Sequence, residues 1–150
     1  MKVFDSLQQV QEWVGQDELV GEWLTVTQEH INQFAKATGD EQWIHVDQER
    51  AKSGPFGAPI AHGFLTLSLL PQLCSTAFQI HGARLGVNYG LNRVRFTAPV
   101  PVNSRLRVLA VLKSCSPIEG GVQLTWLSRV ECEGSDKPVC IAESLTRWYV

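Results

Sequence analysis

The spacing of hydrophobic and polar positions changes along the chain and predicts where helices and strands lie. In residues 4–14 the apolar positions are three or four apart, which predicts a short amphipathic helix ending at Gly15. Residues 20–27 alternate roughly between apolar and polar and predict a strand. Thr27 is the expected N-cap of a second helix, which ends at Gly39.

The middle of the chain combines a long loop with an unusually apolar segment. Residues 40–62 are rich in glycine and proline, and only residues 47–53 are expected to form one or two helical turns. A loop of this length in a small domain is usually functional. Residues 63–80 are apolar on nearly all sides, which predicts a buried helix, kinked or broken at Pro71.

The second half of the chain is rich in β-forming residues. Turn sequences separate four segments, and the last three alternate in the way expected of antiparallel strands. We therefore expect an α+β hot-dog fold, in which a curved antiparallel sheet wraps one long apolar helix, within a single domain of residues 1–150. The four segments are residues 84–100, 104–117, 121–134 and 137–150.

Composition and charge exclude several classes of protein. The chain is 44% hydrophobic and 19% charged, with a net charge of −2 and no cluster of basic residues, so we expect neither nucleic-acid nor membrane binding. No export signal and no run of roughly 18 apolar residues is found, which favours the cytoplasm. None of the four cysteines has CxxC spacing, so we expect reduced thiols and no metal site.

Asp40 and His45 are the first candidates for chemistry, because they stand five residues apart directly after Gly39. A tight loop can bring both side chains to one small volume, where a carboxylate and a neutral imidazole hold one water and move its proton. Spacing alone leaves the structural alternative open. An aspartate after glycine often caps a turn, and a histidine between apolar residues is often part of the core.

A second candidate is the start of the apolar helix, where His62 precedes Gly63. The first N–H groups of a helix lack partners, and glycine allows close approach, so Gly63 suits an oxyanion. The alternative is that this glycine only begins a helix close to a crowded sheet. Ser68 lies just over one turn further on and either bonds back to its own helix or supports the catalytic loop. His62 is expected to stabilise the turn, with a catalytic role as the alternative.

The segments GDEQWIHVD, GPFGAPIAHG and FLTLSLL together closely resemble the MaoC-like, (R)-specific enoyl-CoA hydratase family. The downstream segment GVNYGLNRVRFTAPVPVNSRLR resembles the nodulation protein N-like branch of that family. The resemblance implies that Asp40 and His45 form the catalytic dyad, with Gly63 as the oxyanion donor and Ser68 in support. It also implies reversible hydration of trans-2-enoyl-CoA to (3R)-hydroxyacyl-CoA, without metal or cofactor, by a homodimer.

Substrate recognition is less clearly encoded. Trp43 belongs to a Gln-Trp pair that replaces the Asn-Pro of many family members, so substrate preference does not transfer. The substrate is expected to be an acyl thioester of coenzyme A or of acyl carrier protein. Two other functions remain open: a hot-dog acyl-CoA thioesterase, and a non-catalytic acyl-thioester-binding accessory protein. Candidate binding residues, with core packing or surface charge as the alternative for each, are Trp43, Phe56, Ile60, Phe64, Arg93 and Arg95.

Overall fold

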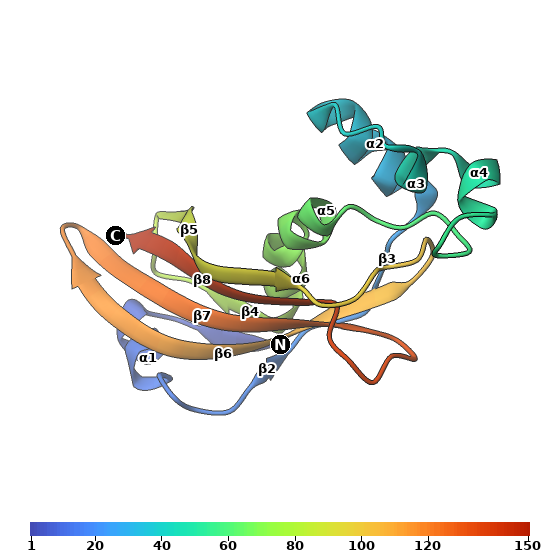
Figure 1. The fold of residues 1–150 in the computed structure, drawn as a ribbon. Coiled ribbons are helices and arrows are strands. Elements are labelled where there is room, and N and C mark those ends of the chain that lie inside the picture. Colours follow the sequence, from blue (N-terminus) through green and yellow to red (C-terminus); the bar gives the residue numbers. More distant parts are fainter.

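A long, curved antiparallel sheet dominates the computed structural model, which describes all 150 residues (Figure 1). Its strands are β2 (Leu19–Val20), β3 (Leu24–Thr25), β5 (Leu85–Phe96), β6 (Arg105–Ile118), β7 (Gly121–Cys132) and β8 (Cys140–Tyr149). They lie in the order β2-β6-β7-β8-β5, and β3 also pairs with β6. Strand β5 therefore forms one edge of the sheet. The predicted α+β hot-dog arrangement is confirmed.

Two short helices, rather than one long helix, lie against the sheet: α5 (Gly63–Ser68) and α6 (Leu70–Ala77). The break predicted at Pro71 is confirmed, since this proline stands in the first turn of α6, where its missing N–H costs least. The prediction that the helix continues to residue 80 was wrong. Residues 78–80 form strand β4 (Phe78–Ile80), which pairs in parallel with β1 (Lys2–Phe4).

The amino-terminal predictions hold with shorter elements. Helix α1 (Leu7–Glu12) starts later than expected, because the Ser6 side chain accepts a hydrogen bond from the Gln9 N–H and caps it there. Residues 2–4, partly assigned to that helix, are strand β1 instead. The strand predicted for residues 20–27 is present only as the short strands β2 and β3.

Helix α2 (Gln28–Thr38) has both of its predicted ends. The Thr27 side chain accepts from the His30 N–H at 3.2 Å, and Gly39 adopts the left-handed conformation with φ of 80°. The helical turns predicted at residues 47–53 are α4 (Gln48–Lys52). Helix α3 (Trp43–Val46) was expected to be loop.

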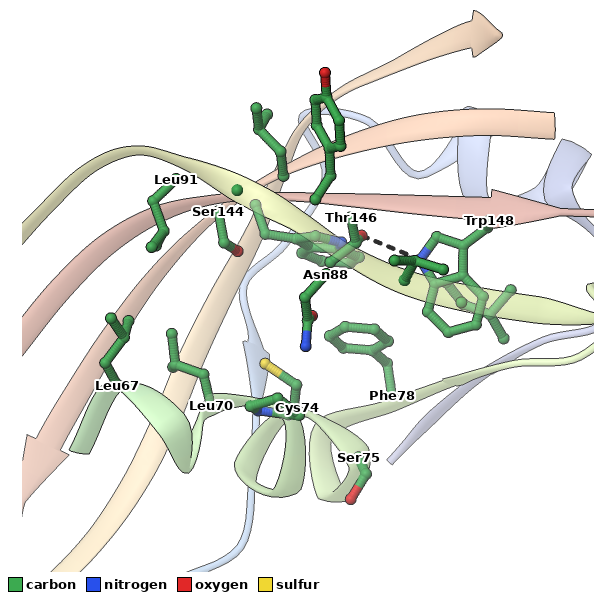
Figure 2. A pocket seen from close by; sticks show the side chains of 18 of the residues that line it. Leu67, Leu70, Cys74, Ser75, Phe78, Asn88, Leu91, Ser144, Thr146 and Trp148 are labelled. Carbon is green, nitrogen blue, oxygen red and sulfur yellow. Dashed lines mark hydrogen bonds between the residues drawn. The ribbon is translucent and has the colours of Figure 1, made fainter. Parts of the chain in front are cut away.

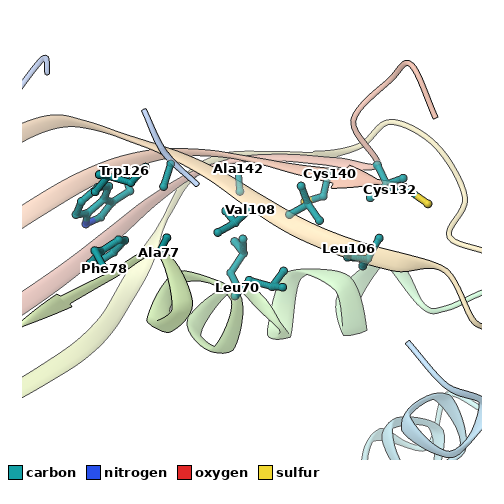
Figure 3. Close-up of a cluster of buried hydrophobic side chains, with 14 of the residues drawn as sticks. Leu70, Ala77, Phe78, Leu106, Val108, Trp126, Cys132, Cys140 and Ala142 are labelled. Atoms are coloured by element: carbon teal, nitrogen blue, oxygen red, sulfur yellow. The ribbon is translucent and has the colours of Figure 1, made fainter. Parts of the chain in front are cut away.

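A cavity separates part of α6 from strands β5 and β8, so the helix pair and the sheet are not in contact everywhere (Figure 2). Where they do meet, the core is tightly packed (Figure 3). Leu70 and Ala77 of α6 face Val108 and Ala142 of the sheet, and all four are buried. The expectation that this segment is buried on nearly all sides was wrong for α5, since the Phe64 side chain is 67% exposed.

The Trp126 ring stacks on Phe78 at the end of α6, with ring centres 4.3 Å apart and planes 10° from parallel. This contact closes the core at the end of the helix pair. The cysteines are free, as predicted. No helix of the structure has the length and apolar character needed to span a membrane.

Candidate active site

Three side chains converge where the loop after α2 meets the start of α5. Asp40 follows the left-handed Gly39, His45 lies on α3, and His62 immediately precedes α5. One nitrogen or oxygen from each side chain lies within 4.8 Å of the others. A carboxylate and two imidazoles at this spacing suit a bound water and are also donor types that divalent metals accept. The structure brings Asp40 and His45 together, as predicted, and adds His62.

The His45 imidazole is held in one orientation and one tautomer. Its Nδ1 lies 2.7 Å from the carbonyl oxygen of Ile60. Because a carbonyl can only accept, Nδ1 carries the hydrogen, and Nε2 of the neutral ring keeps its lone pair. The backbone of α3 is fixed as well, since the Gln28 side-chain amide donates to the His45 carbonyl at 2.8 Å. His45 is thus prepared to accept a proton at Nε2.

Burial lowers the pKa of His45 below its usual value of 6.5. The hydrogen bond to the Ile60 carbonyl opposes this by favouring the charged ring, His62 lowers the pKa further, and the Asp40 carboxylate raises it. The net direction is downward, so the ring is predominantly neutral at neutral pH and available as a base.

His62 contacts both of the other residues. Its Nε2 lies 2.8 Å from the backbone oxygen of Asp40, and its ring stacks on that of His45 with centres 3.8 Å apart. Only 2% of His62 is exposed. The predicted turn-stabilising contact is present, but the stacking on His45 could not be predicted, because the two residues are 17 positions apart.

Gly63, the first residue of α5, is glycine for a packing reason as well as a chemical one. A Cβ at this position would lie 2.6 Å from the ring of Phe96 on β5, closer than real Cβ contacts. Its N–H is one of those that the helix cannot satisfy internally. The position therefore combines close contact with the sheet and an amide donor beside His62.

Ser68 donates its hydroxyl hydrogen to the Phe64 carbonyl at 2.7 Å, within its own helix. That is the structural alternative considered for this residue. Ser68 also lines the cavity beside α6, just over one helical turn from Gly63.

The cavity has a volume of about 820 Å³ and is bounded by α5, α6, β4, β5 and β8. Leu67 lies at one end and Trp148 at the other (Figure 2). The Trp148 Nε1 donates to the Thr146 hydroxyl at 3.1 Å, and a Cβ on Gly86 would meet the indole ring at 2.8 Å. These contacts fix the indole as the wall at that end.

The six predicted binding residues lie outside this cavity. The Arg50 guanidinium covers the Trp43 ring at 4.2 Å, so this ring packs against α4. Ile60 acts through its carbonyl on His45. Phe64 packs edge-on against Phe96 at 5.7 Å. The remaining three residues are exposed on the surface: Phe56, Arg93 and Arg95.

Sequence reasoning missed the cavity wall formed by the last strand. Ser144, Thr146 and Trp148 of β8 all line the cavity. They are two residues apart, so they share one face of the strand. That alternation was visible in the sequence, but the curvature that separates this part of the sheet from α6 was not.

A curved antiparallel sheet around a helix pair, with an acid and two histidines at the start of the helices, defines a hot-dog-fold protein with an acid–base site. The model of the family described as MaoC like domain matches residues 9–127, and the chain belongs to this family. The resemblance found in the sequence is thereby confirmed.

Individual relatives agree with this assignment. The chain is 50% identical over 149 residues to 3-hydroxyacyl-thioester dehydratase Z of Mycobacterium tuberculosis (strain ATCC 25618 / H37Rv), with 99% of each chain covered. It is 44% identical over 145 residues to nodulation protein N of Rhizobium leguminosarum bv. viciae, covering 94% of this chain and 89% of the relative.

Among solved structures, the unliganded R-hydratase PhaJ1 of Pseudomonas aeruginosa has a TM-score of 0.71 at 24% identity. The match covers 91% of this chain and 81% of that chain. This likeness shows the fold.

The lowered pKa of His45 is directly measurable. In a histidine-detected NMR titration we expect its midpoint below 6.5, because burial disfavours the charged ring. Asp40→Asn should lower the midpoint further, since it removes the carboxylate that stabilises the charged form. A midpoint above 6.5, or an upward shift in Asp40→Asn, would contradict this description of the site.

Proposed function

We propose that the protein is an (R)-specific hydro-lyase, which interconverts trans-2-enoyl thioesters and (3R)-hydroxyacyl thioesters. The observation that carries this proposal is the convergence of the Asp40 carboxylate and the His45 imidazole, whose Nε2 keeps its lone pair, at the start of α5 next to the Gly63 amide. The cavity begins further along α5, at Leu67 and Ser68, and Asp40, His45 and Gly63 do not line it. The name of the dehydratase relative, at 50% identity over nearly the whole chain, supports it.

In hydration, the dyad holds one water between the carboxylate and Nε2. His45 accepts a proton from this water as the oxygen bonds to the β-carbon. The π electrons of the double bond shift toward the α-carbon and the thioester carbonyl. The dyad then delivers the same proton to the α-carbon, so one water adds and nothing else is consumed. Dehydration runs the same steps backwards.

The thioester oxygen gains negative charge during this reaction. Gly63 supplies an amide N–H at the start of α5, where it can donate to that oxygen. The proton moves between named side chains and the substrate, so these steps need neither a metal nor an organic cofactor.

The cavity beside α6 is the proposed binding site for the acyl chain. Ser68 of α5 lines it and lies just over one helical turn from Gly63, so the acyl chain of a thioester held at Gly63 would reach the cavity along α5. Apolar groups of Leu67, Leu70 and Phe78 line it, and burial of each methylene contributes about 0.8 kcal/mol. We take coenzyme A or acyl carrier protein as the carrier. Action in the cytoplasm fits the free cysteines.

Asp40→Asn and His45→Gln should each lower kcat for crotonyl-CoA hydration by about a hundred- to ten-thousand-fold, because each removes a proton-handling group. Loss of the enoyl-thioester absorbance measures the rate. Circular dichroism establishes that the variants fold.

Glu41→Gln is the matched control, since Glu41 is an exposed acid next to Asp40. It should retain wild-type kcat, and EDTA should leave the wild-type rate unchanged. Near wild-type turnover by Asp40→Asn would reject the assignment. Release of free thiol instead of loss of the double bond would identify a thioesterase, and binding without either signal would identify an accessory protein.

Trp148 is expected to limit acyl length, because its ring closes the end of the cavity away from Leu67. Trp148→Ala should raise kcat/KM for long enoyl chains relative to crotonyl-CoA by about tenfold, measured across a series of chain lengths. Phe56→Ala, at an exposed residue outside the cavity, is the control. An unchanged chain-length profile in Trp148→Ala would place the acyl chain elsewhere.

A second copy of the chain is the proposed partner. Edge strand β5 pairs only with β8, so the other side of its backbone is open, and its exposed apolar side chains include Leu85, Val87 and Tyr89. Pairing of two β5 edges about a twofold axis would join the sheets side by side and cover this surface.

Val87→Asp should convert the dimer to a monomer in sedimentation equilibrium, because a charge would be buried at the joint. Val20→Asp, at an exposed valine of β2, is the control and should leave the mass unchanged. A wild-type protein that sediments as a monomer would contradict the proposal.

A further inference from the structure

We propose that His62 is a positioning residue for the dyad: it anchors the backbone of Asp40 through Nε2 and fixes the ring plane of His45 by stacking. This inference rests on the proposed function for its kinetic consequence. Its structural content, a single side chain that orients both members of the dyad, stands on the geometry alone.

The hydrogen bond to Asp40 fixes the loop on which the acid stands. His62 Nε2 lies 2.8 Å from the Asp40 carbonyl oxygen, and since that oxygen only accepts, Nε2 is the donor. Asp40 is itself exposed and lies beyond the end of α2. The bond to a buried ring is therefore the contact that ties this peptide to the base of α5.

The stacking contact fixes His45, the second residue of the dyad. The rings of His62 and His45 are 3.8 Å apart and 24° from parallel. The hydrogen bond from Nδ1 to Ile60 holds one edge of the His45 ring, and the ring face of His62 lying against it resists tilting of the opposite edge, which carries Nε2. Nε2 of His45 is thereby aimed in one direction.

His62 itself has little freedom to move. It is 2% exposed, and the Phe34 ring lies 4.9 Å from it at an angle of 56°. The backbone of His62 leads directly into α5, so Gly63 is fixed in the same step. One buried ring thus sets the relative positions of the acid, the base and the amide donor.

Two substitutions separate the two contacts. His62→Phe keeps a ring face for His45 but loses the donor to Asp40, whereas His62→Gln keeps an N–H donor but loses the ring. We expect His62→Phe to lower kcat for crotonyl-CoA hydration at least tenfold with KM within threefold. His62→Gln should recover part of that loss. Ile31→Val, at a buried residue of α2, controls for general destabilisation and should keep wild-type kcat while lowering Tm.

NMR measures the same contacts without turnover. In His62→Phe the Asp40 carbonyl carbon and the Glu41 amide, which share one peptide, should shift as the hydrogen bond is lost. In His62→Gln the His45 ring protons should shift as the stacked ring is removed. If these signals stay unchanged in both variants, or if both keep kcat within twofold of wild type, the inference is overturned.

The two proposals fail in different ways. The proposed function is wrong if the wild-type protein hydrates no enoyl thioester. If the His62 variants nevertheless show both NMR changes, His62 remains the positioning residue of the cluster. The role of His62 is wrong if the wild-type protein is active and the His62 variants lose activity only in proportion to their loss of folded protein. The proposed function then stands.

Discussion

The close approach of the α5–α6 pair to the concave face of the sheet is the constraint on which the rest of the structure depends. Two glycines permit it. A Cβ on Gly21 would lie 2.9 Å from the Leu73 carbonyl of α6, and a Cβ on Gly63 would overlap the Phe96 ring of β5. Because neither position carries a side chain, the helices lie directly against the sheet. The start of α5 is held there, and Asp40, His45 and His62 gather around it. Where the sheet curves away, the cavity remains.

Local signals in the sequence predicted the elements that local physics determines. Thr27 and Gly39 define the ends of α2 through hydrogen bonding and backbone conformation within a few residues, and Pro71 marks the break between α5 and α6. The short helix α3 and strand β4 were missed, because both depend on contacts between distant parts of the chain. Strand β4 exists because Phe78–Ile80 finds a partner in Lys2–Phe4.

In the candidate site, too, features set by neighbouring residues were predictable and features set by distant contacts were not. Asp40 and His45 were identifiable because they lie five residues apart and belong to a recognisable family pattern. The part played by His62 depends on two contacts over 17 and 22 residues of sequence, which no periodicity encodes. The six predicted binding residues do not line the cavity for a related reason. They were chosen for their place near the dyad, whereas the lining comes from distant segments that include α6, β5 and β8.

The cysteine of α6 has a practical consequence for distinguishing the enzyme classes. Burial raises the pKa of the Cys74 thiol to about 12 and that of Cys140 to about 11. Disulfide-exchange dyes react with thiolates, so at mildly alkaline pH these two side chains stay essentially unreactive in the folded protein. These two thiols therefore add little to the colour that such a dye develops with coenzyme A set free from a substrate.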